Sequence, residues 1–506
     1  MPTISQQKKL PIWHLIVLFA GAVYLISGCF SNSLWFDESF TVGLMNHTSL
    51  FEMIKWSSYD VHPHLYYIIL WFYTRVFGTS IPVMRLFSAL FAVAFASLGL
   101  THIRRDFGDR IGFWFTTVTY LLGATLTYAL QIRMYTMAMY LVGLTAIYAY
   151  RIARGEATKK NCILFAVFSI ASAYTHYFAL FTVAAINVML LVRTILQKDS
   201  VKRWLVLGAA QICAYLPGAY VFRLQIKTGG ADWIRLLWPD TVYNLVSYHL
   251  VGDELYTFFE TTKQYRYGGL VFLALYVLAG IVLYRRTRRA ANDSDEGNTA
   301  KAREAVRWSL YAYFGVVLFS MLVSLVREIF YIRYTMVLFV FTVFVIAYLI
   351  ATSKDAWKKA VAVILLVVLA AYPVYGTFRL AYDPSADAVT DALDDKVEEG
   401  DIFFFEGADV FVATVRYPDN MQYYYNGAHW KVENTYRSFG PNARVLDSLD
   451  CPEINEFRGR VWVTRGACYD YLMSLGDCRE VTSTGTIHLK NHNYNFEFVL
   501  IEKGMN

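Results

Sequence analysis

The sequence predicts a polytopic α-helical membrane protein with a small C-terminal α/β domain. Of its 506 residues, 56% are hydrophobic and only 17% are charged, and the mean hydropathy is +0.36. These values are too apolar for a soluble domain of ordinary composition. Long apolar runs alternate with short basic loops up to residue 379, and the remaining residues have the composition of a soluble domain. The chain therefore divides into a transmembrane part and a tail.

The apolar runs predict about eleven transmembrane helices, because a helix needs about 20 apolar residues to cross the hydrocarbon core. The predicted spans are residues 12–30, 82–103, 111–130, 134–152, 161–174, 177–195, 204–222, 268–285, 308–326, 334–351 and 360–378. The first span follows Lys8 and Lys9 and lacks a convincing cleavage site. We therefore expect it to be retained, with the N-terminus in the cytoplasm.

The loops between these spans predict the topology. With eleven crossings every basic loop falls on the cytoplasmic side, as the positive-inside rule requires; these loops are residues 104–110, 151–160, 198–203, 285–307 and 353–359. An additional crossing at residues 64–78 would place them outside. We therefore expect that short apolar segment to lie along the outer leaflet, near amphipathic helices in residues 40–56. The outer face then collects the loops 31–81 and 223–267 and the tail.

The tail, residues 380–506, predicts an extracytoplasmic α/β domain. Strand-like runs at 402–405, 461–464 and 496–501 alternate with turn signals, and residues 387–398 have helical character. Three cysteines lie in this region: Cys451, Cys468 and Cys478. One disulfide among them is an alternative that the odd number does not favour. The transmembrane domain is accordingly residues 1–379.

The formal net charge of +6 does not identify a partner. Cytoplasmic loops of membrane proteins supply such an excess, so we expect membrane lipids and no nucleic acid as partners.

Four groups of polar side chains fall on the predicted outer face. They are Asp37 with Glu38, His62 with His64, Arg133 and Tyr135 with His176 and Tyr177, and Arg327 and Glu328 with Arg333 and Tyr334. Each has a simpler explanation taken alone: acids favour a helix N-terminus, histidines form interfacial hydrogen bonds, and arginines snorkel to headgroups. Their coincidence on one face favours a functional site.

This combination suits one type of chemistry. A carboxylate at the water boundary can act as general base on an acceptor hydroxyl, and arginines can hold a phosphate and stabilise its departure. A lipid-linked sugar phosphate would present its headgroup at this depth while its tail stays in the bilayer. The residues therefore indicate glycosyl transfer from a polyprenyl-phosphate sugar.

Three motifs carry a family resemblance: Leu-Trp-Phe-Asp-Glu-Ser-Phe at 34–40, Asp-Val-His-Pro-His-Leu-Tyr-Tyr at 60–67 and Met-Arg-Leu-Phe-Ser-Ala-Leu at 84–90. Their order and spacing resemble the GT-C superfamily, in the branch of protein O-mannosyltransferases and lipid A aminoarabinose transferases. Residues 131–135, 174–178 and 332–334 are similar to later motifs of that branch. The match covers most of residues 10–351.

The resemblance implies an integral membrane enzyme that moves a hexosyl or pentosyl unit from a polyprenyl phosphate to a protein, lipid or cell-envelope glycan. It implies that Asp37 is the base, with Glu38 as its neighbour or as a metal ligand, and that a single displacement inverts the anomeric centre. The expected contacts to the donor phosphate come from Arg133, Tyr135, Arg333 and Tyr334. Some relatives place a divalent metal nearby, and here Glu38 and His62 are the candidate ligands.

Two residues depart from the family pattern. The usual His-Pro-Pro is His62-Pro63-His64 in this chain, which adds an imidazole and leaves metal use open. Gln131 stands where relatives commonly have an acid. The role of that acid therefore does not transfer.

The remaining candidates are substrate contacts: His62, His64, His176, Tyr177, Trp233 and Trp238. The two tryptophans lie in the loop 223–267, a candidate lid over the acceptor. The aromatic belt at the membrane interface is the favoured alternative for them.

Three other functions remain open. A ligase or polymerase of lipid-linked glycan would use the same outer face. A lipid-sugar transporter or flippase would favour ionisable residues at mid-membrane and repeated halves, and the sequence shows no repeat. A glycan-binding receptor would need no acids in the first loop.

Overall fold

The structure is a computed structural model. It describes residues 11–30, 34–227, 234, 238–252, 271, 274, 278, 281, 285, 297–381, 392–426, 436, 438–489 and 494–504.

Described residues up to 381 form a helical bundle. Its elements are α1 (Ile12–Ser27), α2 (Phe36–His47), α3 (Leu50–Ser57), α4 (Leu65–Phe77), α5 (Ile81–Ser97), the π-helical turn η1 (Gly99–Ile103), α6 (Arg104–Phe107), α7 (Asp109–Leu121), α8 (Gly123–Ala129), α9 (Tyr135–Ala153), α10 (Lys159–Ala173), α11 (Tyr177–Leu196), α12 (Val201–Lys227), α13 (Trp238–Val251), α15 (Gly297–Ser324), the 3-10 helix η3 (Ile332–Leu338), α16 (Phe339–Thr352) and α17 (Ala356–Ala381).

Seven described segments are long and apolar enough to cross a membrane: Ile81–Phe107, Tyr135–Ala153, Tyr177–Leu196, Val201–Ile226, Gly297–Ser324, Ile332–Thr352 and Ala356–Arg379. The helix α9 is almost completely buried, whereas apolar side chains of α12 and α17 face outward, as expected for contact with lipid. The prediction of a polytopic helical membrane fold is confirmed.

Some predicted spans have a different form. The helix α1 is a shorter apolar helix, and α10 has only 15 residues. The predicted span 111–130 is divided into α7 and α8, because the chain takes an extended conformation at Leu122. The predicted span 268–285 lies mostly outside the described residues. The number of crossings stays a prediction.

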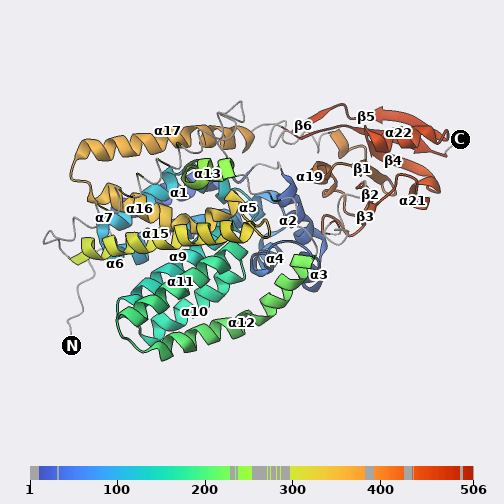
Figure 1. Cartoon of the computed structure of the whole chain (residues 1–506). Helices are drawn as coiled ribbons and strands as arrows, with labels where there is room; N and C mark the ends of the chain where they lie inside the picture. The colour runs from blue at the N-terminus through green and yellow to red at the C-terminus, as the bar shows by residue number, and fades with distance from the viewer. Residues whose placement is uncertain are drawn as a thin grey trace.

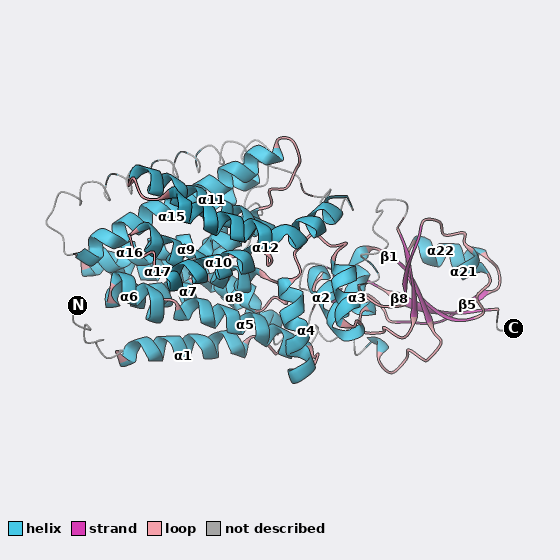
Figure 2. Cartoon of the chain, turned by 90° about the horizontal axis from the view of Figure 1, so that it is seen from below, coloured by secondary structure: helices cyan, strands magenta, loops and turns pink. Residues whose placement is uncertain are grey.

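The segments α2, α3 and α4 lie together at the end of the bundle next to the tail (Figures 1 and 2). The 13-residue helix α4 corresponds to the short apolar segment 64–78. The backbone N–H of Leu65 donates to the carbonyl of Tyr174 at 3.0 Å, which joins the start of α4 to the loop before α11. We call the end of the bundle that α2, α3 and α4 form the tail end.

The tail contains a six-stranded mixed sheet in the order β3-β2-β1-β4-β8-β5. Its strands are β1 (Ile402–Glu406), β2 (Met421–Tyr425), β3 (Ala443–Leu446), β4 (Gly459–Thr464), β5 (Cys478–Ser483) and β8 (Phe498–Lys503). Strands β3, β2, β1 and β4 are parallel, and β8 pairs antiparallel with β4 and β5. A hairpin of β6 (Ile487–Leu489) and β7 (Tyr494–Phe496) accompanies the sheet.

Helices cover the tail sheet, as expected for an α/β domain. The short elements are η5 (Ala408–Val410), α19 (Phe411–Thr414), α21 (Pro452–Asn455) and α22 (Ala467–Ser474), of which α22 packs on β1, β4 and β5. The predicted strands fall in β1, β4 and the β7–β8 region. Of the predicted helix 387–398, residues 387–391 lie outside the described residues; residues 392 and 393 are helical and a turn follows at 394–396. Cys451, Cys468 and Cys478 are free thiols.

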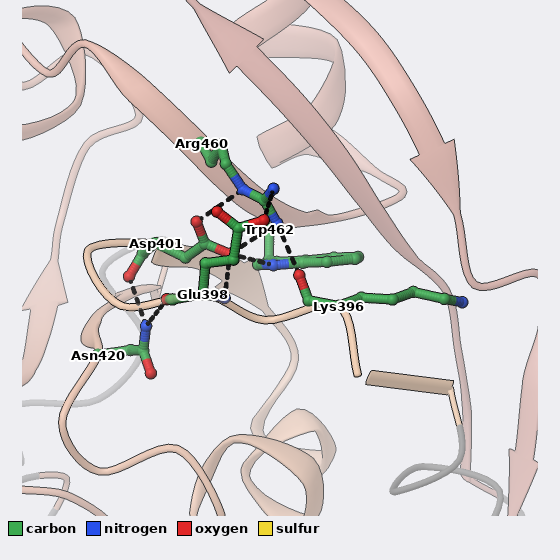
Figure 3. A network of polar contacts seen from close by, with 6 residues as sticks. All are labelled: Lys396, Glu398, Asp401, Asn420, Arg460 and Trp462. Carbon is green, nitrogen blue, oxygen red and sulfur yellow. Dashed lines mark hydrogen bonds and ion pairs between the residues drawn. The ribbon is translucent and has the colours of Figure 1, made fainter. Parts of the chain in front are cut away.

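A buried carboxylate holds the start of β1 against β4 (Figure 3). Asp401 accepts hydrogen bonds from Arg460 Nε, from Trp462 Nε1 and from the backbone N–H of Glu398, each at 2.9 Å. Asn420 donates to the Asp401 carbonyl at 2.9 Å. One acid therefore orders the loop before β1 and anchors two residues of β4, Arg460 and Trp462.

The tail packs on α2 through aromatic side chains. The Phe439 ring lies 5.1 Å from the ring of Phe36 and 5.8 Å from that of Phe40. Gly43 permits this approach, because a Cβ there would lie 2.3 Å from the carbonyl oxygen of Ser438 and 2.9 Å from the Cα of Phe439. The helix α2 is therefore in contact with both the bundle and the tail.

We predict that Asp401→Ala destabilises the tail. The substitution removes the acceptor of the Trp462 indole and one of the two carboxylates paired with Arg460. Breaking a buried pair costs about 3–5 kcal/mol. Thermal unfolding should shift to lower temperature and limited trypsin digestion of the tail should accelerate. The exposed Asp447 supplies the control, since Asp447→Ala should leave both measurements unchanged. Equal behaviour of the two variants would contradict the role given to Asp401.

We predict that Gly43→Ala loosens the contact between α2 and the tail, whereas Gly208→Ala does not. Alanine favours a helix by about 0.5–1 kcal/mol over glycine. Gly208 has open space around a Cβ, but at Gly43 the added carbon meets backbone atoms. Amide hydrogen exchange in α2 and at residues 438–440 should therefore accelerate only in the Gly43 variant. Unchanged exchange there would show that the close approach is not required.

Candidate active site

The candidate base Asp37 lies in the first turn of α2. Its Oδ2 is 3.2 Å from Arg333 Nη2, and its side chain is 23% exposed. The neighbouring Glu38 side chain is 3% exposed. Adjacent residues of a helix point in directions about 100° apart. Asp37 is therefore the member of the pair that reaches solvent.

Both carboxylate oxygens of Glu38 accept hydrogen bonds from protein groups. Its Oε1 accepts from the backbone N–H of Ile132 at 2.9 Å. Its Oε2 accepts from Arg85 Nη2 at 3.3 Å and from the backbone N–H of Trp35 at 3.4 Å. This carboxylate joins α2 to α5 and to the turn before α9.

Arg133 lies in that turn and reaches back to α2. Its Nη1 donates to the Asp37 carbonyl at 3.1 Å, to Tyr67 OH at 3.3 Å and to Thr41 Oγ1 at 3.4 Å. Burial alone would lower the pKa of Arg133, but Tyr67, Asp37 and Asp60 raise it above the ordinary value. The guanidinium is therefore a permanent buried cation.

Arg333 approaches Asp37 from η3. Its guanidinium carbon lies 4.8 Å from the ring centre of Trp35 and 5.2 Å from that of Tyr331. Such cation–π contacts orient the planar guanidinium while leaving its edge available for hydrogen bonds. Arg333 thus presents a second cation beside the acid.

Two histidines and two tyrosines complete the cluster. The rings of His62 and His176 are 5.1 Å apart, and Tyr334 lies 5.9 Å and 5.1 Å from them. Tyr135 is 5.6 Å from His176. Burial, reinforced by the two arginines, lowers the pKa of His62 well below its ordinary value and that of His176 to about 3. Both imidazoles are therefore neutral.

The tautomer of His176 follows from its hydrogen bond. Its Nδ1 accepts from the backbone N–H of Phe178 at 3.1 Å. In a neutral ring the proton then resides on Nε2, which becomes a donor. This nitrogen is one of five buried atoms of the cluster that lack a hydrogen-bond partner among the described residues: His62 Nδ1, Arg133 Nε, Tyr135 OH, His176 Nε2 and Arg333 Nε.

Buried polar groups in proteins nearly always have a partner, so a group of unpartnered ones indicates a missing ligand. Three of the five are fixed donors, namely the two arginine nitrogens and His176 Nε2. Tyr135 can also donate. Together with two permanent cations, this set fits an anion.

A further pair of tyrosines extends the cluster. The Tyr128 ring lies 4.9 Å from Tyr135, and its hydroxyl is hydrogen-bonded to that of Tyr248 on α13. The helix α13, which belongs to the loop 223–267, is thereby connected to the cluster.

The other predicted site residues lie elsewhere. Both ring nitrogens of His64 are occupied, by Ser57 Oγ at 3.0 Å and Ser58 Oγ at 3.2 Å. Tyr177 donates to Gln225 on α12. Trp233 lies outside the described residues, and Trp238 begins α13 but its side chain is not described.

Glu38, one of the two predicted metal ligands, is occupied by protein donors, and the metal stays a prediction. Both oxygens of Glu38 accept from protein donors, and His176 presents an N–H toward the cluster rather than a lone pair. No group of three or more acidic, histidine or cysteine side chains within the described part of the chain is arranged to hold a metal ion. The chemistry derived below uses no metal.

Several residues of the site were given no role from the sequence. Arg85 holds Glu38, and Asp60 accepts from Tyr67 OH at 3.0 Å, which places a third carboxylate beside Arg133. Burial raises the pKa of Asp60. Both residues lie inside the motifs that carry the resemblance, and their place in those motifs could have identified them as candidates.

Comparison with known proteins identifies the fold. No protein-family model and no curated protein sequence matches the chain. Among solved structures, ArnT from Cupriavidus metallidurans bound to undecaprenyl phosphate is similar, with a TM-score of 0.57 and 12% identity over 96% of this chain and 98% of that one. Its apo form gives a TM-score of 0.55 at 12% identity, over 96% and 97%. At this identity the likeness concerns the fold, and the chain has the GT-C fold that its motifs predicted.

Proposed function

We propose that the chain is a membrane glycosyltransferase that moves a monosaccharide from a polyprenyl-phosphate donor to an acceptor hydroxyl. The observation that carries the proposal is the group of unpartnered buried donors around Arg133 and Arg333, beside the partly exposed Asp37. ArnT, which shares the fold, has been crystallised with undecaprenyl phosphate. A phosphate of the same kind would occupy these donors.

The proposed reaction uses the negative charge of Asp37 and the positive charges of Arg133 and Arg333. Asp37 takes the proton of the acceptor hydroxyl as its oxygen attacks the anomeric carbon. The bond between that carbon and the phosphate oxygen breaks, and the phosphate leaves with one more negative charge than the donor carried. Arg133 and Arg333 stabilise this added charge. A single displacement of this type inverts the anomeric centre.

The neutral side chains assist in binding. His176 Nε2–H and Tyr135 OH can donate to phosphate or sugar oxygens, and the rings of His62 and Tyr334 lie next to that of His176. Because these groups carry no charge, they orient the donor without trapping the more highly charged product.

The active site lies at the tail end of the bundle. The loop charges of the sequence assign that end to the outside of the cell, with the N-terminus in the cytoplasm. An acceptor on the outer side, whether protein, lipid or envelope glycan, would reach Asp37 there.

We predict that Asp37→Asn lowers kcat by about 10²–10⁴-fold, the usual contribution of a general base. The amide can still accept from Arg333 but cannot take a proton. Transfer from a labelled undecaprenyl-phosphate sugar to isolated membranes measures the rate, and thermal unfolding checks the fold. Asp419→Asn, at an exposed position of the tail, is the control. Wild-type turnover by a folded Asp37→Asn enzyme would exclude the base assignment.

We predict that Arg333→Ala weakens binding of undecaprenyl phosphate and lowers kcat by about 10²–10³-fold, as loss of one transition-state donor does. Lysine at this position should restore only part of the activity, because it keeps the charge but not the fork of donors. Arg327→Ala removes an exposed arginine that donates to the Ile226 carbonyl and should change neither quantity. Native mass spectrometry with the lipid phosphate gives the affinity, and an unchanged value would contradict the phosphate contact.

A further inference from the structure

A second polar site lies at the end of the bundle opposite the tail. A cavity of about 510 Å³ opens between η1, the end of α9 and the start of α10. Its lining consists of Thr101, His102, Arg105, Tyr148, Arg151, Glu156, Thr158, Lys160 and Asn161. Three of these side chains are cationic and one is acidic.

This cavity is separate from the candidate active site. Along α9, Arg151 is 16 residues beyond Tyr135, which corresponds to about 24 Å at 1.5 Å per residue. The neighbouring α6 lies at the end of the bundle farthest from the tail (Figures 1 and 2). The distance approaches the thickness of a bilayer core, so the two sites face opposite membrane surfaces.

Arg151 is a buried cation of this cavity and is held in place by two contacts. It is 3% exposed, its Nε donates to Asp106 Oδ2 at 2.7 Å, and its guanidinium lies 5.0 Å from the ring centre of Tyr148. Its Nη2 is buried without a hydrogen-bond partner among the described residues. A guanidinium held by a carboxylate and an aromatic face, with a spare donor in a polar cavity, fits an additional anion.

Two further cations lie at the rim of the cavity. Arg105 and Lys160 are exposed there, and Lys160 belongs to the first turn of α10, where the helix dipole also favours an anion. Glu156 is exposed at the same rim, and Asp106 is already paired with Arg151 and, at 3.7 Å, with Arg105. The cavity lining therefore carries three cations and one carboxylate, that of Glu156, and is net positive.

A π-helical turn contributes the remaining wall. The turn η1 carries Thr101 and His102, and the His102 Nε2 lies 3.3 Å from Tyr148 OH. Gly99 lets this turn pack closely on α7, since a Cβ there would lie 2.6 Å from the Gly112 carbonyl oxygen. Such turns interrupt α-helices frequently at functional sites.

We infer that this cavity binds a phosphate group, presented by the headgroup of an anionic phospholipid. Basic pockets between transmembrane helices at a membrane surface are suited to such headgroups. The site goes beyond the proposed glycosyl transfer and does not depend on it.

The test uses the purified full-length chain and two matched double variants. Arg105→Ala with Lys160→Ala removes two exposed cations that line the cavity. Arg110→Ala with Lys159→Ala removes two exposed cations of the same basic end that do not line it. Native mass spectrometry and thermal unfolding then compare phosphatidylglycerol with phosphatidylcholine of the same acyl chains.

We expect phosphatidylglycerol to bind and stabilise the wild-type chain more than phosphatidylcholine does. The cavity double variant should lose roughly 30-fold in affinity for phosphatidylglycerol, from the usual effect of two basic residues. The control double variant should stay within about twofold of the wild type. Inorganic phosphate is the second probe. If it alone gives the same variant dependence, the phosphate group comes from a soluble compound rather than a lipid.

Two results would overturn the inference. Equal losses in both double variants would show a non-specific charge effect. No preference for phosphatidylglycerol, together with no stabilisation by inorganic phosphate, would show that the cavity does not bind phosphate groups.

Discussion

The geometry of the candidate active site depends on one buried carboxylate, that of Glu38. It accepts from Arg85 on α5, from the Ile132 N–H before α9 and from the Trp35 N–H at the start of α2. Removing one partner of a buried ion pair leaves the other charge uncompensated, at a cost of several kcal/mol. The first turn of α2 therefore cannot shift without losing all three contacts, and this fixes the position of Asp37.

The positive charges next to Asp37 are arranged around that fixed turn. Arg133 donates to the Asp37 backbone carbonyl rather than to its carboxylate, whereas Arg333 contacts the carboxylate itself. Within the described part of the chain, Arg333 forms an ion pair with Asp37, and each arginine keeps an Nε without a partner there. Binding of a phosphate can therefore proceed without disrupting the contacts that hold α2.

Much of this arrangement could be predicted from the sequence, because charges near the ends of apolar spans must meet at the membrane surface. Asp37, Arg133 and Arg333 come together, as do His62 and His176. What the sequence could not decide was the direction of neighbouring side chains. Asp37 and Glu38 are equivalent as a dipeptide, yet only the packed helix shows which one faces inward. His64 is similar in this respect, because the two serines that occupy its ring belong to the end of α3.

The break at Leu122 and the cavity at Arg151 could not be predicted from the sequence for another reason. The extended residue Leu122 divides a predicted span into α7 and α8, although the apolar composition continues across it. The cavity at Arg151 depends on Asp106, which lies 45 residues earlier in the chain. No local pattern records such a contact, since it is created by packing of η1 and α6 beside α9. The basic loops at that end predict the cytoplasmic side of the membrane but not a cavity.

The tail has a structural connection to the active site through α2. One face of this helix contacts the bundle through Glu38, and the ring of Phe36 and the Cα of Gly43 face Phe439 of the tail. A single hydrophobic cluster includes residues of α2, α4, α5 and the tail sheet. Because Asp37 lies next to Phe36, any displacement of the tail acts on the turn that carries the candidate base. The tail is therefore part of the scaffold that positions Asp37.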